Sequence, residues 1–542
     1  MITSATGQAE HYLAAENFVI AREDNQATGK SQALARGKQK LWSLLLLLVL
    51  FSVYPVESQA AGSSPVYIVI WFDTEDYILP ASDDVAKRLA DFLTAEGVHA
   101  TFKVVGEKAR TLEQRGRVDV IAALRNHEIG YHSNTHSQHP TPAEYESTLD
   151  WGSGVEEFTR RERPGFEDVW RIFGKKPCCY GQPGSSWAPQ SFGALHQWGV
   201  KLYLDEGSQV GLDGKPFWYG GLLNIFNTVE GQELRPNDNW DNLEQSKSNF
   251  REFYTRMSSA PHGGLISLYF HPCEFIHQWF WDMNFALGAN PPREQWKVPP
   301  QKSASQQKQA FGYFESLVGY MKTFPNVRFI TGTEALELYP DLAQGRSFSS
   351  NELLAIANSV TSNVSFQEWG EYALSASEIF QLLTSYVAVS AINGRHATGV
   401  RLSETPYGPS SPPPILDKPI QVSMKQFLST TLDVRDFVAS TNQVPSSVWL
   451  GSKPVPPDDY LVTLAAISKR LLSARPLPDS VTIAAAQLVA SEHIAKDSVK
   501  VWEWPIFPEG FHSAHLIELA KLQAWTLKPA ILISRQTEVS RR

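Results

Sequence analysis

Strand-like apolar runs alternate with helical stretches between residues 66 and 330, and this alternation constrains the fold more than any other feature. The run Val66–Phe72 is apolar at nearly every position, as in a strand that is covered on both faces. The stretch Asp83–Glu96 follows it with apolar residues at helical spacing. Such alternation predicts a parallel α/β layer or barrel, in which functional side chains gather where the strands end. Further strands are expected at 100–105, 129–131, 200–204, 265–270 and 327–330.

Three polar clusters directly follow predicted strands. They are Asp73–Asp76, His132–His136 and His271–Glu274. Two histidines four positions apart can lie on one face of a helical turn, so both can reach one metal ion while a carboxylate from a neighbouring strand end completes the protein ligands. A histidine pair at this spacing is most often a coincidence, and an acidic cluster after a strand is most often a solvated turn or a helix cap. The three together favour a metal site that hydrolyses an amide or ester, with a second carboxylate as base and His271 as acid.

The same segments resemble the successive motifs of the polysaccharide deacetylase family, the nodulation-deacetylase homology domain. The resemblance rests on Phe72–Asp76, Ala100–Gly106, Glu128–His136 and Leu268–Pro272, and it covers roughly residues 65–340. It implies a distorted (β/α) barrel with a zinc-type divalent metal site. It also implies a hydrolase that removes acetyl groups from the amino sugars of a peptidoglycan-like or chitin-like polysaccharide.

The resemblance also implies a role for each polar residue of the clusters. The base would be Asp73 and the acid His271. The metal ligands would be His132, His136 and one of the two acidic residues Glu75 and Asp76, between which the sequence leaves the choice open.

The chain departs from the family pattern at one position. The third family motif normally offers an arginine before a proline to hold the carboxylate of the base. Here Gln182 stands before Pro183. A glutamine can form a hydrogen bond to a carboxylate but supplies no charge, so we expect Gln182 to contact a base whose pKa is set differently.

The composition changes after about residue 340. Three later segments, Leu374–Leu383, Val422–Leu428 and Pro457–Leu461, place a small or capping residue a few positions before an apolar helical stripe. This recurrence predicts a smaller, mainly helical repeat region over residues 345–535. Part of it, 433–461, is similar to the pseudomurein-binding repeat, which implies attachment to a cell wall.

Residues 1–61 read as an extension that ends in a secretory signal. Basic residues at 36, 38 and 40 precede the apolar run Leu41–Tyr54, and the small residues of 58–62 follow it. The run is shorter than the roughly 20 residues of a spanning helix, so cleavage is expected and an uncleaved anchor is the alternative. The chain is therefore predicted to be secreted or associated with the cell envelope.

The charge of the chain argues against nucleic acid as a partner. The net charge is −9, and no run rich in lysine or arginine supplies the positive surface that phosphate binding requires. The partner that we expect is an acetylated polysaccharide. Two other functions stay open: an amidohydrolase that acts on a small amide, and a catalytically weak carbohydrate-binding envelope protein, which the missing arginine would favour.

Overall fold

The computed structural model describes residues 64–228, 234–236, 239–393 and 398–533. The predicted extension and signal of residues 1–61 lie outside this part of the chain. Within it, no helix combines the length and the hydropathy that crossing a membrane requires.

Seven parallel strands form the central sheet, in the order β8-β1-β2-β3-β4-β5-β7. All nine residues of β1 are buried, which explains its continuous apolar sequence. A further strand, β9 (Val327–Ile330), pairs in parallel with β1. The seven strands are β1 (Val66–Thr74), β2 (Thr101–Val104), β3 (Glu128–Tyr131), β4 (Cys179–Tyr180), β5 (Leu202–Asp205), β7 (Leu222–Phe226) and β8 (Gly264–Phe270).

The sheet curls until its two ends meet. Thr228, just after β7, donates its backbone N–H to the carbonyl of Ser267 in β8 at 2.9 Å. The backbone N–H of Ser267 in turn donates to Oγ1 of Thr228 at 3.0 Å. The result is a barrel that is closed by one short contact instead of a full strand pair, so the predicted distorted (β/α) barrel is confirmed.

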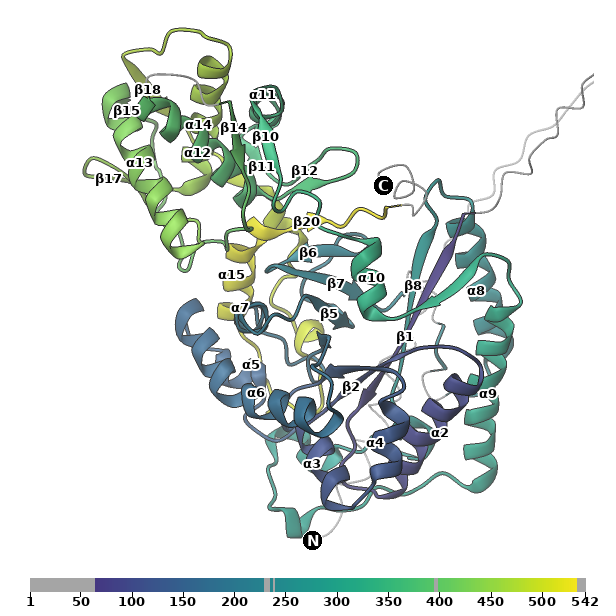
Figure 1. The fold of residues 1–542 in the computed structure, drawn as a ribbon. Coiled ribbons are helices and arrows are strands. Elements are labelled where there is room, and N and C mark those ends of the chain that lie inside the picture. The colour runs from purple at the N-terminus through teal and green to yellow at the C-terminus, as the bar shows by residue number, and fades with distance from the viewer. Residues whose placement is uncertain (1–63, 229–233, 237–238, 394–397, 534–542) are drawn as a thin grey trace, which may run out of the picture. The chain divides into compact units, whose positions relative to one another are not determined.

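Helices surround this sheet on its outer side (Figure 1). The predicted helix over 83–96 is found as α2, and its buried side chains are those at helical spacing, among them Val85, Leu89 and Leu93. The barrel helices are α2 (Ala81–Ala95), α3 (Gly106–Gln114), α4 (Val118–Leu124), α5 (Pro142–Glu146), α6 (Trp151–Phe173), α7 (Gln190–Gln197), α8 (Leu243–Ser258), α9 (Ala304–Lys322) and α10 (Gly332–Leu338).

A second hydrophobic core lies beyond residue 340 and is built mainly from helices. The three helix starts predicted there are found, since α12 begins at Ala376, α13 at Met424 and α14 at Pro457. Short two-stranded sheets, such as β15 (Ile420–Ser423) with β18 (Ser480–Ile483), accompany them. The mainly helical second region is therefore confirmed, while its binding to a cell wall stays a prediction. Its helices are α11 (Ser350–Ser359), α12 (Ala376–Asn393), α13 (Met424–Thr441) and α14 (Pro457–Leu472).

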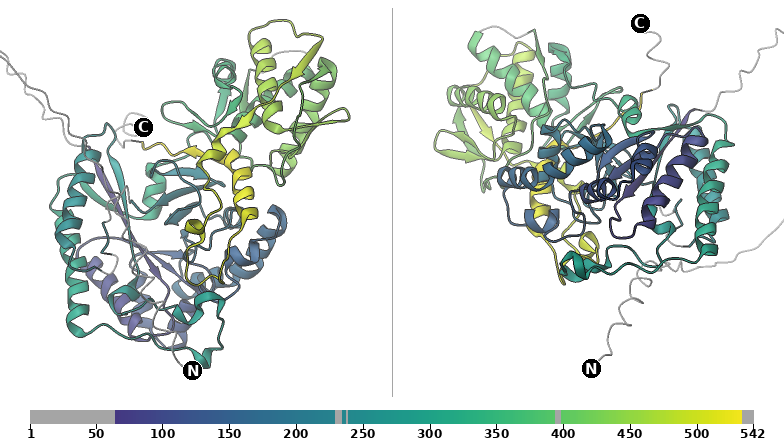
Figure 2. Two further views of the ribbon diagram at one scale, coloured as in Figure 1. Left: turned by 180° about the vertical axis from the view of Figure 1, so that it is seen from behind. Right: turned by 60° about the horizontal axis from the view of Figure 1, so that its bottom comes forward.

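The last part of the chain returns to the barrel, as the yellow segment in Figure 2 shows. Helix α15 (Ala514–Gln523) and strand β20 (Lys528–Pro529) follow the second core in sequence. β20 pairs antiparallel with β6 (Phe217–Tyr219), which itself pairs with β7. The side chains of the returning segment belong to the core of the barrel; they include Val501, Trp502, Phe507, Leu516, Ile517 and Leu527.

Candidate metal centre

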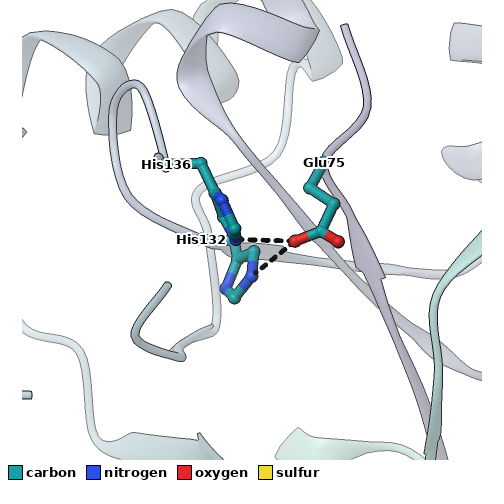
Figure 3. Close-up of side chains that lie close together, drawn as sticks. All are labelled: Glu75, His132 and His136. Atoms are coloured by element: carbon teal, nitrogen blue, oxygen red, sulfur yellow. Dashed lines mark ion pairs between the residues drawn. The ribbon is translucent and has the colours of Figure 1, made fainter. Parts of the chain in front are cut away.

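A carboxylate and two imidazoles converge at the carboxyl ends of β1 and β3 (Figure 3). Oε2 of Glu75 lies 2.6 Å from Nε2 of His136 and 3.4 Å from Nε2 of His132. One potential ligand atom from each residue lies within 4.8 Å of the others, and all three side chains are buried. Two nitrogens and one oxygen at this separation could hold a divalent metal ion.

The histidine pair is brought together by a loop and not by the helical turn that its spacing suggested. His132 to Ser137 form no helix. Ser133 and His136 both have positive φ, 62° and 54°, a left-handed conformation that costs about 1–3 kcal/mol in a residue other than glycine. A hydrogen bond of 3.1 Å from the backbone N–H of His136 to Oγ of Ser133 holds this loop.

Both imidazoles are oriented by hydrogen bonds at their Nδ1 atoms. Nδ1 of His132 donates to the carbonyl of Gly181 at 3.0 Å. Nδ1 of His136 lies 2.6 Å from Oγ of Ser137, which donates to Oδ2 of Asp282 at 2.7 Å. Each Nε2 is therefore left with its lone pair toward Glu75, as expected of histidines that bind a metal.

The charges of the cluster also suit a cation. Burial raises the pKa of Glu75, but the nearby imidazoles of His136, His271 and His132 outweigh it, so that the pKa is well below its usual value. Burial lowers the pKa of His132 despite the nearby carboxylates. An ionised carboxylate beside a neutral imidazole is the protonation state that metal ligands need.

Asp73 and His271 flank the cluster. Nε2 of His271 lies 3.7 Å from Oδ2 of Asp73 and 3.9 Å from Oε1 of Glu75. Burial lowers the pKa of His271, but Glu274 and Glu75 overcome this effect and raise the pKa to about 9. His271 is therefore an imidazolium at neutral pH, which is the form that a proton donor requires.

Asp76 lies apart from the cluster, although it follows Glu75 directly. Its Oδ2 is 2.7 Å from Nε2 of His277, and its Oδ1 accepts backbone hydrogen bonds from Ile78 and Leu79. Of the two acidic residues between which the sequence left the choice open, Glu75 is the one that lies with the histidine pair. No sequence signal had marked His277, because its link to Asp76 arises only in the fold.

Gln182 contacts other groups than the base. Its Oε1 accepts a hydrogen bond from the hydroxyl of Tyr203 at 2.6 Å, and its Nε2 donates to the carbonyl of Glu206 at 3.1 Å. The group that does reach Asp73 is Lys103, whose Nζ lies 2.8 Å from Oδ1. Lys103 lies within Ala100–Gly106, which the sequence predicted as a strand and as a family motif without assigning Lys103 a place at the site.

Two tryptophans lie against His136 of the cluster formed by Glu75, His132 and His136. The ring centroids of Trp281 and Trp504 lie 5.4 and 5.6 Å from that of His136. Trp281 is fully buried, whereas Trp504 comes from the returning segment and is partly buried. A Cβ atom at Gly184 would overlap the ring of Trp504, so only glycine leaves room for this contact.

No family model matches the chain, and neither does any curated protein. Among solved structures, a putative polysaccharide deacetylase from Mycobacterium smegmatis is similar at 14% identity and a TM-score of 0.34, covering 51% of this chain and 90% of that one. A probable polysaccharide deacetylase from Pseudomonas aeruginosa PAO1 is similar at 12% identity and a TM-score of 0.35, covering 51% and 91%. An allantoinase is similar at 14% identity and a TM-score of 0.34, also covering 51% and 91%.

Proposed function

We propose that this chain is a metal-dependent hydrolase that removes acetyl groups from the amino sugars of an extracellular or envelope polysaccharide. One observation carries the proposal: Glu75, His132 and His136 converge, and the carboxylate of Asp73 and the imidazole of His271 lie beside them. This is the set of groups that metal-assisted hydrolysis of an amide requires.

Each group has a place in the reaction. The cluster of Glu75, His132 and His136 would hold a divalent cation, for which the nitrogen and oxygen donors favour zinc, and the bound cation would polarise the acetyl carbonyl and acidify a water molecule. Asp73 accepts the proton of the attacking water. His271 donates a proton to the leaving nitrogen as the C–N bond breaks, which yields acetate and a free amine.

The location and the partner belong to the same proposal. The predicted signal supports export, and the predicted wall-binding repeats support attachment of the enzyme to its polymer. Attachment would raise the local concentration of substrate around the barrel.

A small amide is a second candidate substrate, and the burial of the site residues favours it. Trp281 and Trp504 pack against His136, and the side chain of His271 is only 14% exposed. A polymer must pass along a surface groove, whereas a small amide suits an enclosed site.

Acetate release tests the proposal. Purified residues 62–542 are incubated with acetylated chitin-like and peptidoglycan-like polymers, with soluble acetylated monosaccharides and with simple amides. Each assay is run with chelator and with added zinc. We expect metal-dependent acetate release that is lost in Asp73→Asn and kept in Asp436→Asn, a control at an exposed carboxylate of α13.

Release from small amides alone would favour the second candidate. Bound zinc without any hydrolysis would contradict both and favour a carbohydrate-binding protein.

A further inference from the structure

Lys103 is a lysine with no exposed surface in the interior of the barrel. It lies in β2 directly opposite Asp73 of β1 in the strand register. Its side chain passes β3 and β4 and reaches Asp205 at the end of β5. Lysine is rarely buried without a partner, so this path across the barrel requires an explanation.

Two glycines leave the path open. A Cβ atom at Gly130 of β3 would lie 2.8 Å from Cγ of Lys103, closer than real Cβ contacts allow. A Cβ atom at Gly181, directly after β4, would overlap both Nζ of Lys103 and Oδ2 of Asp205. Neither glycine has positive φ, so both are needed for space and not for backbone conformation.

The ammonium group contacts three oxygen atoms. Its Nζ lies 2.6 Å from the carbonyl oxygen of Leu204, 2.8 Å from Oδ1 of Asp73 and 3.0 Å from Oδ2 of Asp205. The contacts with Leu204 and Asp205 are hydrogen bonds, whereas the contact with Asp73 is an ion pair without hydrogen-bond geometry. The ring of Trp71 lies 4.2 Å from Nζ and adds a cation–π contact. Burial lowers the pKa of Lys103, but Asp205 and Asp73 outweigh it and the net pKa is raised, so the group stays charged.

We propose that Lys103 is the positioning residue of the site: its ammonium holds Asp73 ready to take the proton of the attacking water. The inference rests on the proposed function. In this chain a lysine from β2 supplies the positive charge that Gln182 lacks, and Gly130 and Gly181 make room for it. The missing arginine is therefore no sign of an inactive site.

A purely structural role for Lys103 makes a different prediction. Lys103 also neutralises Asp205, so its loss leaves two buried carboxylates without a cation and destabilises the protein. Removing the second carboxylate as well, in the double variant Lys103→Met with Asp205→Asn, relieves that penalty. If neutralising Asp205 were the whole role, the double variant would recover activity together with stability.

The test measures kcat, KM, zinc content and melting temperature for residues 62–542 and their variants. For Lys103→Met we expect kcat to fall on the order of 100-fold, as for misplaced catalytic groups, with KM and zinc content little changed. The double variant should regain much of the melting temperature but not kcat. Gly181→Ala keeps every charge but displaces the ammonium, so it should also lose kcat, whereas Gly312→Ala, with open space around its Cβ position in α9, is the matched control.

The outcomes separate the two ideas. Recovery of kcat in the double variant, or an unchanged kcat in a folded Lys103→Met, would overturn the role of Lys103 while leaving the proposed function intact. A wild-type protein that binds zinc and releases no acetate from any substrate would overturn both.

Discussion

Nδ1 of His271 lies 2.9 Å from Oε1 of Glu274, three residues further along the chain. Both residues belong to the start of the short 3-10 helix η1 (Pro272–Phe275), where the backbone N–H of His271 also donates to Oε2 of Glu274. Arg235 pairs with the same carboxylate. The contact at Nδ1 fixes the orientation of the imidazole, and its Nε2 faces Asp73 and Glu75.

This contact predicts the alkaline limit of the activity. Burial lowers the pKa of His271, and Glu274 is the strongest of the groups that raise it to about 9. The cationic form is present below that pKa, so activity is expected to fall as the pH rises through it. In Glu274→Gln the pKa of His271 should drop, and the fall of kcat should begin at lower pH while activity near pH 6 is largely kept.

The measurement is the profile of kcat between pH 6 and 10. Glu518→Gln, at an exposed carboxylate of α15, is the control. An alkaline limb that is identical in Glu274→Gln and the control would show that His271 is not the proton donor.

The two adjacent carboxylates Glu75 and Asp76 should differ in their effect on metal binding. Glu75 lies with the histidine pair, so Glu75→Gln should weaken zinc binding by at least about 10-fold. Asp76 is paired with His277 and caps the turn after β1, so Asp76→Asn should lower the melting temperature and keep zinc at one equivalent. Zinc titration of both dialysed variants checks this expectation. Loss of zinc in Asp76→Asn alone would exchange the two assignments.

The sequence could predict the barrel because strands buried on both faces are continuously apolar, as in β1. It could also predict where the polar clusters gather, since parallel strands end at one edge of the sheet. Glu75, His132, His136, Asp73 and His271 are all found at that edge.

The residues that were missed act through contacts distant in sequence. In the sequence Lys103 cannot be told from an ordinary strand residue, because its partner Asp205 lies far along the chain at the end of β5. His277 and Trp504 meet the site only through tertiary packing. The prediction that His132 and His136 share a helical turn was wrong. The left-handed conformation of Ser133 and His136, which forms the loop, cannot be predicted from the spacing of the two histidines.

A buried carboxyl away from the site predicts an unusual dependence of stability on pH. Glu146, at the end of α5, has no hydrogen-bond partner for either carboxylate oxygen among the described residues. Burial, with Glu157 nearby, raises its pKa from 4.5 to about 9. Between these values the unfolded chain has lost the proton that the folded chain keeps, so this group lowers stability as the pH rises.

Glu146→Gln removes that ionisation and keeps the shape. It should therefore stabilise the protein by an amount that grows from near zero at pH 4.5 to a few kcal/mol, roughly, at pH 8. Denaturant unfolding of wild type and variant at several pH values measures the difference. A difference in unfolding free energy that does not change with pH would contradict the raised pKa.

The barrel should depend on the returning C-terminal segment for its fold. The hydroxyl of Tyr219 donates to the carbonyl of Ala520 at 3.0 Å, and the backbone N–H of Gly220 donates to Oγ1 of Thr526 at 2.8 Å. β20 adds a strand to the same sheet. A fragment of residues 62–345 loses these bonds and exposes the apolar surface that the segment covers, which costs about 25 cal/mol per Å². We therefore expect the fragment to be insoluble or to melt without cooperativity, while residues 62–542 melt cooperatively.

A fragment that melts within a few degrees of the longer chain would show that the barrel folds without its last segment. In that event the contact of Trp504 with His136 would matter only for the site, and the loss in the fragment would be confined to activity.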